Sequence, residues 1–296
     1  MKRLVKWLLG LIVGSVLVAG LAAGFLFLRG TAKVNRTFTV RVVPVEVPEG
    51  TEARQRGGYL FSAFCAGCHG LDLAGNVILD DPAIGSIAAS NLTSGAGGVG
   101  QRYDDLDYVR AIRHGLRPDG TPLAIMPSQA YWHLSNDDLG ALIAFIKSAP
   151  PVDRRVAKAE LRPLGRILVG LGLFEFAANR IVHDAKRPAA PAPGVTPAYG
   201  AYLVNVGDCR LCHGAALTGG RPPEPGAPFA PGLTGKHLAE WGEAGFIATM
   251  RTGVNPEGHA LDPRYMPWRD YARLSNDDLA AIYAYLQSAM NGTSAQ

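Results

Sequence analysis

The sequence predicts an all-α protein in which one N-terminal transmembrane helix precedes two tandem copies of a small helical domain. Two observations support this fold class. The chain begins with an uncharged run that is long enough to cross a bilayer. Most of the remaining chain is an internal repeat whose apolar positions recur at helical spacing, without the alternation that is typical of strands.

The N-terminal segment, residues 1–30, is predicted to be a membrane anchor. Three basic residues precede an uncharged run of 22 residues from Trp7 to Leu28, which extends about 33 Å as a helix. A cleaved signal peptide is the alternative, because AGLAAG at 19–24 offers small residues to a protease. The apolar FLFL at 25–28 continues the run beyond that point and favours a retained anchor.

The internal repeat divides the rest of the chain into two domains, residues 51–150 and 197–290. GGYL in the first copy corresponds to GAYL in the second, and RAIRHGLRPDG corresponds to ATMRTGVNPEG. The longest match pairs MPSQAYWHLSNDDLGALIAFI with MPWRDYARLSNDDLAAIYAYL. In this last stretch a serine is followed three residues later by an aspartate. This capping box, with Asp in place of Glu, predicts the start of a terminal helix in each domain.

Two segments lie outside the repeat. Residues 31–50 contain alternating apolar residues and prolines, which predict an extended tether or an edge strand. Residues 151–196 form a linker, which closes on a stiff run rich in proline and alanine. Its apolar part, residues 164–182, predicts a helix packed across the two domains, because the run from Ile167 to Phe176 has only ten residues and is too short to span a membrane. A docking element for another subunit or for the membrane surface is the alternative.

The composition is that of a globular protein without a nucleic-acid surface. Apolar residues make up 48% of the chain, charged residues 18%, and the formal net charge is +4. Without the four basic residues that flank the anchor, Lys2, Arg3, Lys6 and Arg29, 25 basic residues meet 25 acidic ones. The soluble part is therefore nearly neutral, and no nucleic-acid partner is expected.

All four cysteines occur in two copies of a Cys-x-x-Cys-His motif, CAGCH and CRLCH. A redox dithiol or a disulfide within each pair would leave the histidines without a role, and so would zinc bound by the four thiols. Covalent attachment of a c-type haem uses every residue of the motif, because the thiols bond to the porphyrin and the histidine ligates the iron. The thiols are Cys65, Cys68, Cys209 and Cys212, and the proximal ligands are His69 and His213.

With these motifs the chain resembles the cytochrome c family, and the resemblance covers both halves from haem motif to terminal helix. Each half also contains a Met-Pro pair in a loop rich in Gly and Pro, 57 residues after His69 and 53 residues after His213. The resemblance implies two tandem cytochrome c-like domains with two covalently bound haems c, and it implies Met126 and Met266 as the sixth iron ligands. A thioether ligand raises the haem potential, which suits an electron carrier.

Three other residues compete as iron ligands. Met250 lies in a helical pattern opposite an isoleucine of the first copy and is interpreted as a core residue. His114 and His133 correspond to Thr252 and Arg273, neither of which can ligate haem iron. Exposed polar positions near helix ends are therefore the simpler interpretation of both histidines.

Further residues are expected around the haems. In the family the proximal histidine commonly donates to a proline carbonyl, a place taken by Pro231 in the second domain and by Ser90 in the first. Serine lacks the fixed φ of proline, so we expect this hydrogen bond to be less secure at the first haem. Matched residues suggest partners for the haem propionates, with solvent-facing side chains as the alternative: Arg113 and Tyr131 in the first domain, Arg251 and Tyr271 in the second.

The sequence therefore predicts a single-pass protein of the bacterial cytoplasmic membrane with its haem domains in the periplasm, where the resemblance implies that c-type haem is attached. It resembles the cytochrome subunits of membrane-bound dehydrogenases, although the familiar members carry three haems and this chain has two motifs. The expected role is electron transfer, not catalysis, from a dehydrogenase or quinol-oxidising complex toward a terminal oxidase. The alternatives are a dihaem peroxidase, which the two matched Met-Pro loops disfavour, and a haem oxidoreductase that acts directly on a small donor.

Overall fold

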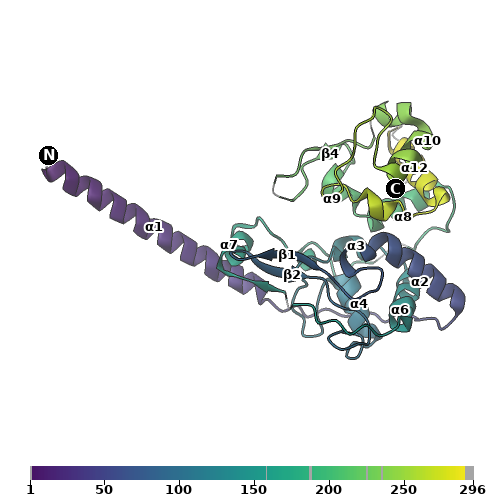
Figure 1. Cartoon of the computed structure of the whole chain (residues 1–296), viewed down its shortest axis with the longest axis horizontal. Coiled ribbons are helices and arrows are strands. Elements are labelled where there is room, and N and C mark those ends of the chain that lie inside the picture. Colours follow the sequence, from purple (N-terminus) through teal and green to yellow (C-terminus); the bar gives the residue numbers. More distant parts are fainter. Residues whose placement is uncertain (1, 158, 187–188, 225, 235, 291–296) are drawn as a thin grey trace.

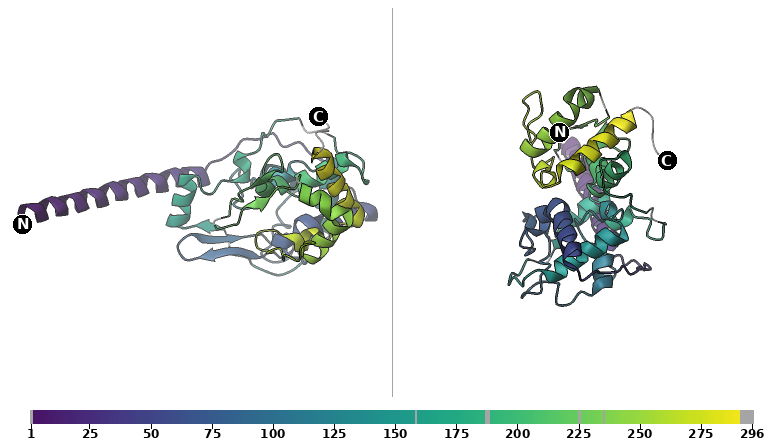
Figure 2. Two further views of the ribbon diagram at one scale, coloured as in Figure 1. Left: turned by 90° about the horizontal axis from the view of Figure 1, so that it is seen from above. Right: turned by 90° about the vertical axis from the view of Figure 1, so that its right-hand side faces the viewer.

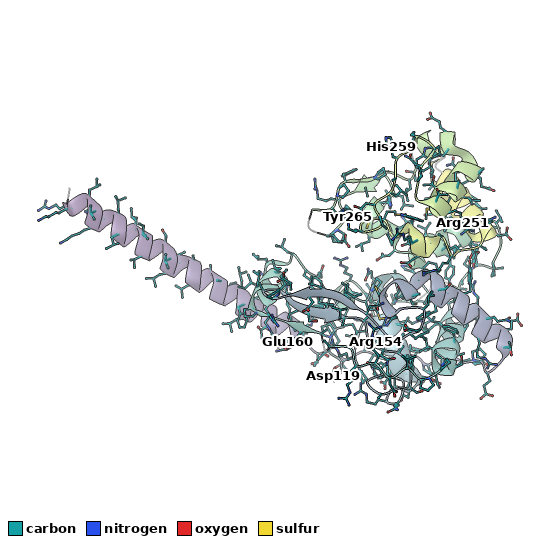
Figure 3. The ribbon with its side chains drawn as sticks, in the orientation of Figure 1. Asp119, Arg154, Glu160, Arg251, His259 and Tyr265 are labelled. Carbon is teal, nitrogen blue, oxygen red and sulfur yellow. The ribbon has the colours of Figure 1, made fainter. Side chains whose placement is uncertain are left out.

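The computed structural model describes residues 2–157, 159–186, 189–224, 226–234 and 236–290. A long helix, α1 (Lys2–Val34), projects from two compact helical domains that lie against each other (Figure 1, Figure 2). Over most of its length the side chains of α1 extend into open space (Figure 3). The prediction of an all-α fold with one N-terminal apolar helix is confirmed. The helix ends at Val34, four residues beyond the predicted anchor.

The first domain is built from helices and a short sheet. Its helices are α2 (Thr51–Phe64), α3 (Ala66–His69), α4 (Asp105–His114), α5 (Ser128–Tyr131) and α6 (Asn136–Ser148). Strands β1 (Val77–Asp81) and β2 (Gly85–Ala88) form an antiparallel hairpin, and β3 (Glu160–Leu161) of the linker pairs with β2. The apolar pattern does not predict this sheet, because its strands are too short for alternation to stand out.

The second domain repeats the helix order of the first. Its helices are α8 (Pro197–Val206), α9 (Cys209–His213), α10 (Lys236–Thr252), α11 (Trp268–Tyr271) and α12 (Asn276–Met290). Two short strands, β4 (Gly219–Gly220) and β5 (Ala230–Pro231), pair antiparallel. Matching stretches of the internal repeat therefore form matching helices.

In each domain the first helix crosses the last one at a glycine. A Cβ on Gly57 would lie 2.0 Å from the carbonyl oxygen of Ala141 in α6, and a Cβ on Gly200 would lie 1.9 Å from that of Ala281 in α12. Only a residue without a side chain allows the backbones to approach this closely. The crossing fixes the helix that leads directly into each haem motif.

The terminal helix of the first domain is capped with the help of the second domain. Ser135 Oγ accepts a hydrogen bond from the Asp138 N–H at 2.9 Å, as the capping box predicts. A hydroxyl bridges the other half of the box: Tyr202 OH donates to Asp138 at 2.6 Å and accepts from the Ser135 N–H at 3.3 Å. Arg56 also forms a bidentate ion pair with Asp138, at 2.7 and 2.9 Å.

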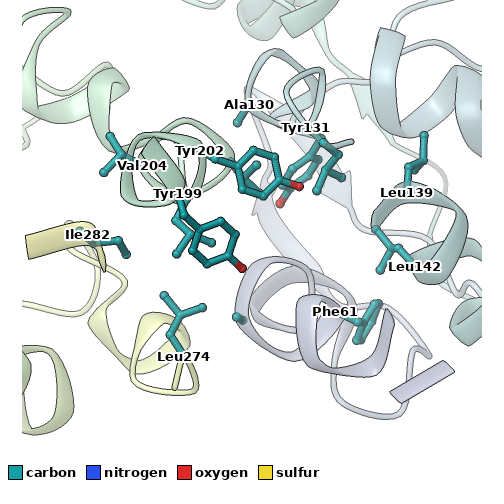
Figure 4. Packing of buried hydrophobic residues seen from close by; sticks show 14 of the residues in the cluster. Phe61, Ala130, Tyr131, Leu139, Leu142, Tyr199, Tyr202, Val204, Leu274 and Ile282 are labelled. Carbon is teal, nitrogen blue, oxygen red and sulfur yellow. The ribbon is translucent and has the colours of Figure 1, made fainter. Parts of the chain in front are cut away.

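The second domain is capped in the same way by the first. Tyr59 OH donates to Asp278 and accepts from the Ser275 N–H at 2.8 Å. Between the two caps, Arg56 donates to Tyr199 OH at 3.3 Å, and these two residues occupy matching places before GGYL and GAYL. Each domain thus presents the same surface to the other, which is an isologous interface with approximate two-fold symmetry. Figure 4 shows Tyr199 and Tyr202 in this interface.

The apolar part of the linker forms α7 (Pro163–Leu171), which packs against the C-terminal end of α1 (Figure 1). A small second core at this place contains Ile87, Leu161, Val169 and Phe176. A helix forms over only the first half of the predicted segment, and it packs against α1 and not across both haem domains as predicted. Glycines on α1 and α7 allow the backbones of these two helices to approach closely. Larger side chains at the contact would keep two helices farther apart.

The tether after α1 runs extended along the first domain. Phe38 N–H donates to the Gly120 carbonyl at 2.9 Å, and the Glu46 carbonyl approaches Gly140 of α6. Val42, Val45 and Val47 pack against the main core. No residue between 35 and 50 is assigned to a strand, so the extended tether is observed and the edge strand is not.

Candidate haem sites

Each Cys-x-x-Cys-His motif forms a short helix directly after the first helix of its domain. In the first domain α2 ends at Phe64, and the His69 N–H donates to the Cys65 carbonyl at 3.0 Å. The two thiols, at positions i and i+3, therefore lie on the same side of one helical turn. In the second domain α9 contains the entire motif.

A cavity of about 530 Å³ in the first domain brings the predicted haem-binding residues together. Cys65, Cys68, His69 and Met126 all line it, and most of the remaining lining is apolar. The volume lies within the range of roughly 300–1,000 Å³ that is typical of cofactor pockets. Two thiols, an imidazole and a thioether are the groups that a c-type haem requires, so the residues fit this cofactor.

The second domain presents the same groups in matching elements. Cys209 and Met266 pack at the edge of the main core, as Cys65 and Met126 do. The Met-Pro loops also have matching backbones. The Met126 carbonyl accepts a hydrogen bond at 2.8 Å from the residue two positions on, and the Met266 carbonyl accepts one at 2.7 Å. The two loops therefore offer their thioethers from equivalent places.

Backbone carbonyls orient both proximal histidines. His69 Nδ1 lies 2.9 Å from the Ser90 carbonyl oxygen, and His213 Nδ1 lies 2.7 Å from that of Pro231. When Nδ1 donates to a carbonyl, Nε2 is the ring nitrogen left for a metal. Burial lowers the pKa of both imidazoles, which favours the neutral form that ligates iron.

Ser90 makes this hydrogen bond without the fixed φ of proline because the neighbouring backbone is held by other contacts. The Ala89 N–H donates to the Asn76 carbonyl at 2.9 Å, and the Leu92 N–H donates to the Leu73 carbonyl at 2.8 Å. These two bonds flank Ser90 on both sides. The hydrogen bond to His69, which we expect from sequence to be less secure, is therefore formed in the first domain as its counterpart is in the second.

Tyr131 and Tyr271 tie each Met-Pro loop to the start of its haem motif. Tyr131 OH donates to the Phe64 carbonyl, and Tyr271 OH donates to the Gly207 carbonyl at 2.7 Å. Burial raises the pKa of both phenols well above the ordinary value, so both remain hydrogen-bond donors at neutral pH. The sequence suggests propionates as their partners and does not predict this contact with the backbone.

Arg113 and Arg251 hold the turn between the Met-Pro loop and the terminal helix. Arg113 is fully buried and donates to the Leu134 carbonyl at 3.0 Å and to Asn136 at 2.9 Å. Arg251 makes the matching bond to Asn276 and donates to a different backbone carbonyl of the same turn, that of Ala272. A solvent-facing position, one of the two sequence interpretations of Arg113, is therefore wrong.

Two basic residues that line the first cavity are not predicted from the sequence. Arg102 and Arg117 line the cavity, and guanidinium groups at such places are suited to pair with the carboxylates of a haem. Arg117 corresponds to Asn255 in the second copy of the repeat. Arg117 therefore has no basic counterpart in the second copy of the repeat.

The competing iron ligands lie outside the described lining of the first cavity. His114 is 3% exposed, and its Nδ1 lies 3.0 Å from Nδ1 of His183. Its predicted exposed position is wrong because the linker covers this end of α4. His133 is half-buried beside Trp132. Met250 lies in the core, as its helical pattern predicts.

Both haem motifs lie at the domain interface, where each is close to the Met-Pro region of the other domain. The carboxylate of Asp270, near the second Met-Pro loop, lies beside Gly67 of the first motif, where a Cβ would come within 2.4 Å of it. In the opposite direction, Gln129 donates to Asp208, the residue before Cys209, at 2.6 Å. Each domain's Met-Pro region therefore contacts the other domain's haem motif, which makes the two sites neighbours.

Comparison with known proteins gives matches to both domains. The profile of the cytochrome c family matches residues 55–150 and 197–290. The chain is 29% identical over 277 residues to the fructose dehydrogenase cytochrome subunit of Gluconobacter japonicus, an alignment of 84% of this chain and 56% of that subunit. It is 31% identical over 206 residues to the cytochrome c subunit of the alcohol dehydrogenase (quinone) of Gluconacetobacter polyoxogenes, covering 65% and 40%. The chain therefore spans about half the length of these subunits.

A relative of similar length is the diheme cytochrome c-type protein of Cereibacter sphaeroides. It is 28% identical over 302 residues, which cover 92% of this chain and 97% of that protein. Together with the two family matches, it supports two c-type haems per chain and a role in electron transfer, not in catalysis. Since the two matched ranges cover more than half of its 296 residues, the chain belongs to the cytochrome c family.

Proposed function

We propose that this chain is a membrane-anchored dihaem cytochrome c, with its haem domains in the periplasm, that passes single electrons from a dehydrogenase or quinol source toward a terminal oxidase. The observation that carries the proposal is the pair of adjoining sites, each with a Cys-x-x-Cys-His motif, a histidine-orienting carbonyl and a Met-Pro loop. A c-type haem supplies reversible one-electron chemistry. Two neighbouring sites of matching construction suit the stepwise passage of electrons along the chain.

The residues that would hold each haem follow from the matched elements. The short helices α3 and α9 offer the thiols, and the carbonyls of Ser90 and Pro231 orient the imidazoles. The proposed covalent attachment points are Cys65, Cys68, Cys209 and Cys212. The proposed iron ligands are His69 with Met126 and His213 with Met266. Apolar side chains around the first cavity exclude water, which favours the less charged ferrous state.

Membrane attachment is supported by α1. This helix is long and apolar enough to cross a bilayer, and its apolar side chains are exposed. The proposed periplasmic side rests on the haem attachment that the two motifs require, which the family carries out on the outer side of the cytoplasmic membrane. The domains would then lie where a dehydrogenase or quinol-oxidising complex of the same membrane can reach them.

The names of the relatives support a dehydrogenase as the electron source. One relative is a cytochrome subunit of fructose dehydrogenase and another is a cytochrome c subunit of alcohol dehydrogenase (quinone). Because the chain spans about half the length of these subunits, the identity of a dehydrogenase partner belongs to the proposal.

The haem content gives the first test. We expect two haems per chain that stay attached through denaturation and acid-acetone extraction, because both motifs form thioether bonds. Pyridine haemochrome absorbance against protein mass measures the ratio. Cys65→Ala with Cys68→Ala should reduce the ratio to one, and the matching pair in the second motif should do the same. Recovery of bound zinc without haem would contradict the assignment.

Isolation of the full chain from detergent-solubilised membranes tests the role. We expect it to co-purify with a dehydrogenase subunit or a quinol-oxidising complex, and we expect the donor's substrate to reduce both haems without an added mediator. The unmodified ferric and ferrous protein should bind neither peroxide nor carbon monoxide, because both irons have a sixth ligand. Ligand binding at one haem together with peroxide turnover would favour the dihaem peroxidase instead.

A further inference from the structure

Helix α7 is joined to α1 by two reciprocal glycine contacts. A Cβ on Gly30 would lie 1.7 Å from the Arg166 carbonyl oxygen, and a Cβ on Gly170 would lie 2.1 Å from the Leu26 carbonyl oxygen. Lys33 Nζ also donates to a carbonyl of α7 at 3.3 Å. Backbones this close leave no space for solvent or lipid between the helices. α7 is therefore a fixed neighbour of α1.

These contacts place α7 at the level where α1 leaves the apolar part of a bilayer. The uncharged run of α1 ends at Leu28, and the residues that contact α7 extend from Leu26 to Lys33. At 1.5 Å per residue this range reaches from about 3 Å inside the end of the run to about 8 Å beyond it. Such a range corresponds to the lipid headgroup region. Figure 1 shows α7 beside this part of α1.

The outward side of α7 is apolar. Val169 and two glycines are buried against α1 and the small second core. In contrast, Leu164 and Leu171 are 42% and 51% exposed, and Leu173 in the turn after α7 is 68% exposed. The part of α1 that packs against α7 also has exposed apolar residues, since Phe25 and Leu28 are 65% and 66% exposed. Exposed apolar patches of this kind mark contacts with other molecules or with membranes.

Positive charge gathers at the same place. Residues 26–36 and 162–182 contain six basic residues and the single acid Glu175. Outside these segments and the three basic residues before the membrane run, the chain has 20 basic and 24 acidic residues. The combination of exposed leucines and basic side chains is typical of helices that lie in the membrane interface, because cations attract lipid phosphates.

We propose that α7 and the turn after it, residues 163–174, form a lipid-binding surface that lies in the headgroup region of the outer leaflet. Leu164, Leu171 and Leu173 insert between the lipids, while exposed Arg29 and Arg162 contact phospholipid phosphates. This inference rests on the proposed anchoring of the chain by α1.

Such a surface orients the haem domains over the membrane. β3 leads into α7 within two residues, and Leu161 of β3 shares the small core with Ile87 of β2. Movement of α7 is therefore coupled to the first domain. A single spanning helix would leave that domain free to tilt, whereas a second contact with the same leaflet restricts it to one orientation toward partners in the membrane.

The test is lipid cross-linking from single cysteines in the full chain. The four native cysteines are consumed by haem attachment, so an added cysteine is the single free thiol. Leu171→Cys and Leu173→Cys would carry a maleimide-linked benzophenone in proteoliposomes of phosphatidylethanolamine and phosphatidylglycerol. Leu17→Cys in the spanning helix is the positive control. Val195→Cys in the linker is the matched control, because Val195 and Leu171 are both 51% exposed.

We expect lipid adducts, measured by mass spectrometry, from positions 17, 171 and 173, with yields at least about 10-fold above that of position 195. Adducts from position 17 alone would overturn the lipid-binding role of α7 and leave the anchor intact. Absence of adducts at position 17 would overturn the anchor and this inference together. If positions 171 and 173 cross-linked to a co-purified protein in native membranes instead of to lipid, α7 would be a subunit contact and the proposal would be wrong.

Discussion

Replacing Met126 with alanine is expected to remove about half of the weak far-red absorption band of a methionine–iron bond and to lower the potential of one haem. The proposed ligands Met126 and Met266 lie in separate domains, so the second haem keeps its thioether. Loss of this ligand removes a group that stabilises ferrous iron. Because axial ligands shift haem potentials over about 0.8 V, we expect a drop on the order of 0.1 V or more. Spectroelectrochemical titration measures both effects.

Three further variants make this result specific. Met266→Ala should remove the other half of the band, and the double variant should remove all of it. Met250→Leu is the matched control, since Met250 lies in the core and its loss should leave the band unchanged. Carbon monoxide should bind to the altered haem of each alanine variant and not to the unmodified protein. An unchanged spectrum in Met126→Ala would contradict the assignment of Met126 as the sixth ligand of the first haem.

The internal repeat explains how much of the two sites could be read from sequence. Covalent haem attachment needs particular residue types at fixed spacing, so the motifs are visible without a structure. The repeat then supplies a second copy against which Met126 and Met266 stand out. The same comparison hides Arg117, because its counterpart is Asn255 and the two domains differ at that place. Comparison of the two copies identifies the residues that both haem sites share. It does not identify residues that occur at only one of the two haem sites.

Contacts between distant segments could not be predicted for a different reason. Serine and aspartate three residues apart predict a local capping box, yet the bridging hydroxyl comes from a tyrosine more than sixty residues away. Similarly, the apolar pattern of α7 predicts a buried face and does not tell which surface buries it. Gly30 and Gly170 decide the partner, because only their approach permits the close crossing with α1. Local sequence patterns determine which helix forms, whereas the surface against which that helix packs depends on the shapes of both surfaces.

The isologous interface predicts an unequal effect of two equivalent substitutions. Tyr59→Phe and Tyr202→Phe each remove one hydroxyl that bridges a serine N–H and a carboxylate. After Tyr202→Phe, Asp138 keeps its bidentate ion pair with Arg56. The position that matches Arg56 in the second domain is a tyrosine, so Asp278 has no equivalent arginine. Tyr59→Phe therefore leaves a buried carboxylate with fewer partners.

We expect Tyr59→Phe to lower the free energy of unfolding by about 3 kcal/mol and Tyr202→Phe by about 1 kcal/mol, within the range for an unsatisfied buried polar group. Urea denaturation followed by circular dichroism measures both. Tyr283→Phe in α12 is the control, because its hydroxyl makes none of the described hydrogen bonds between the domains, and its cost should be close to zero. Equal costs for the two interface variants would contradict the role assigned to Arg56. Because these two hydroxyls link the two domains, the double variant should also loosen the domain interface and slow electron exchange between the two haems, while both Met–iron bands remain.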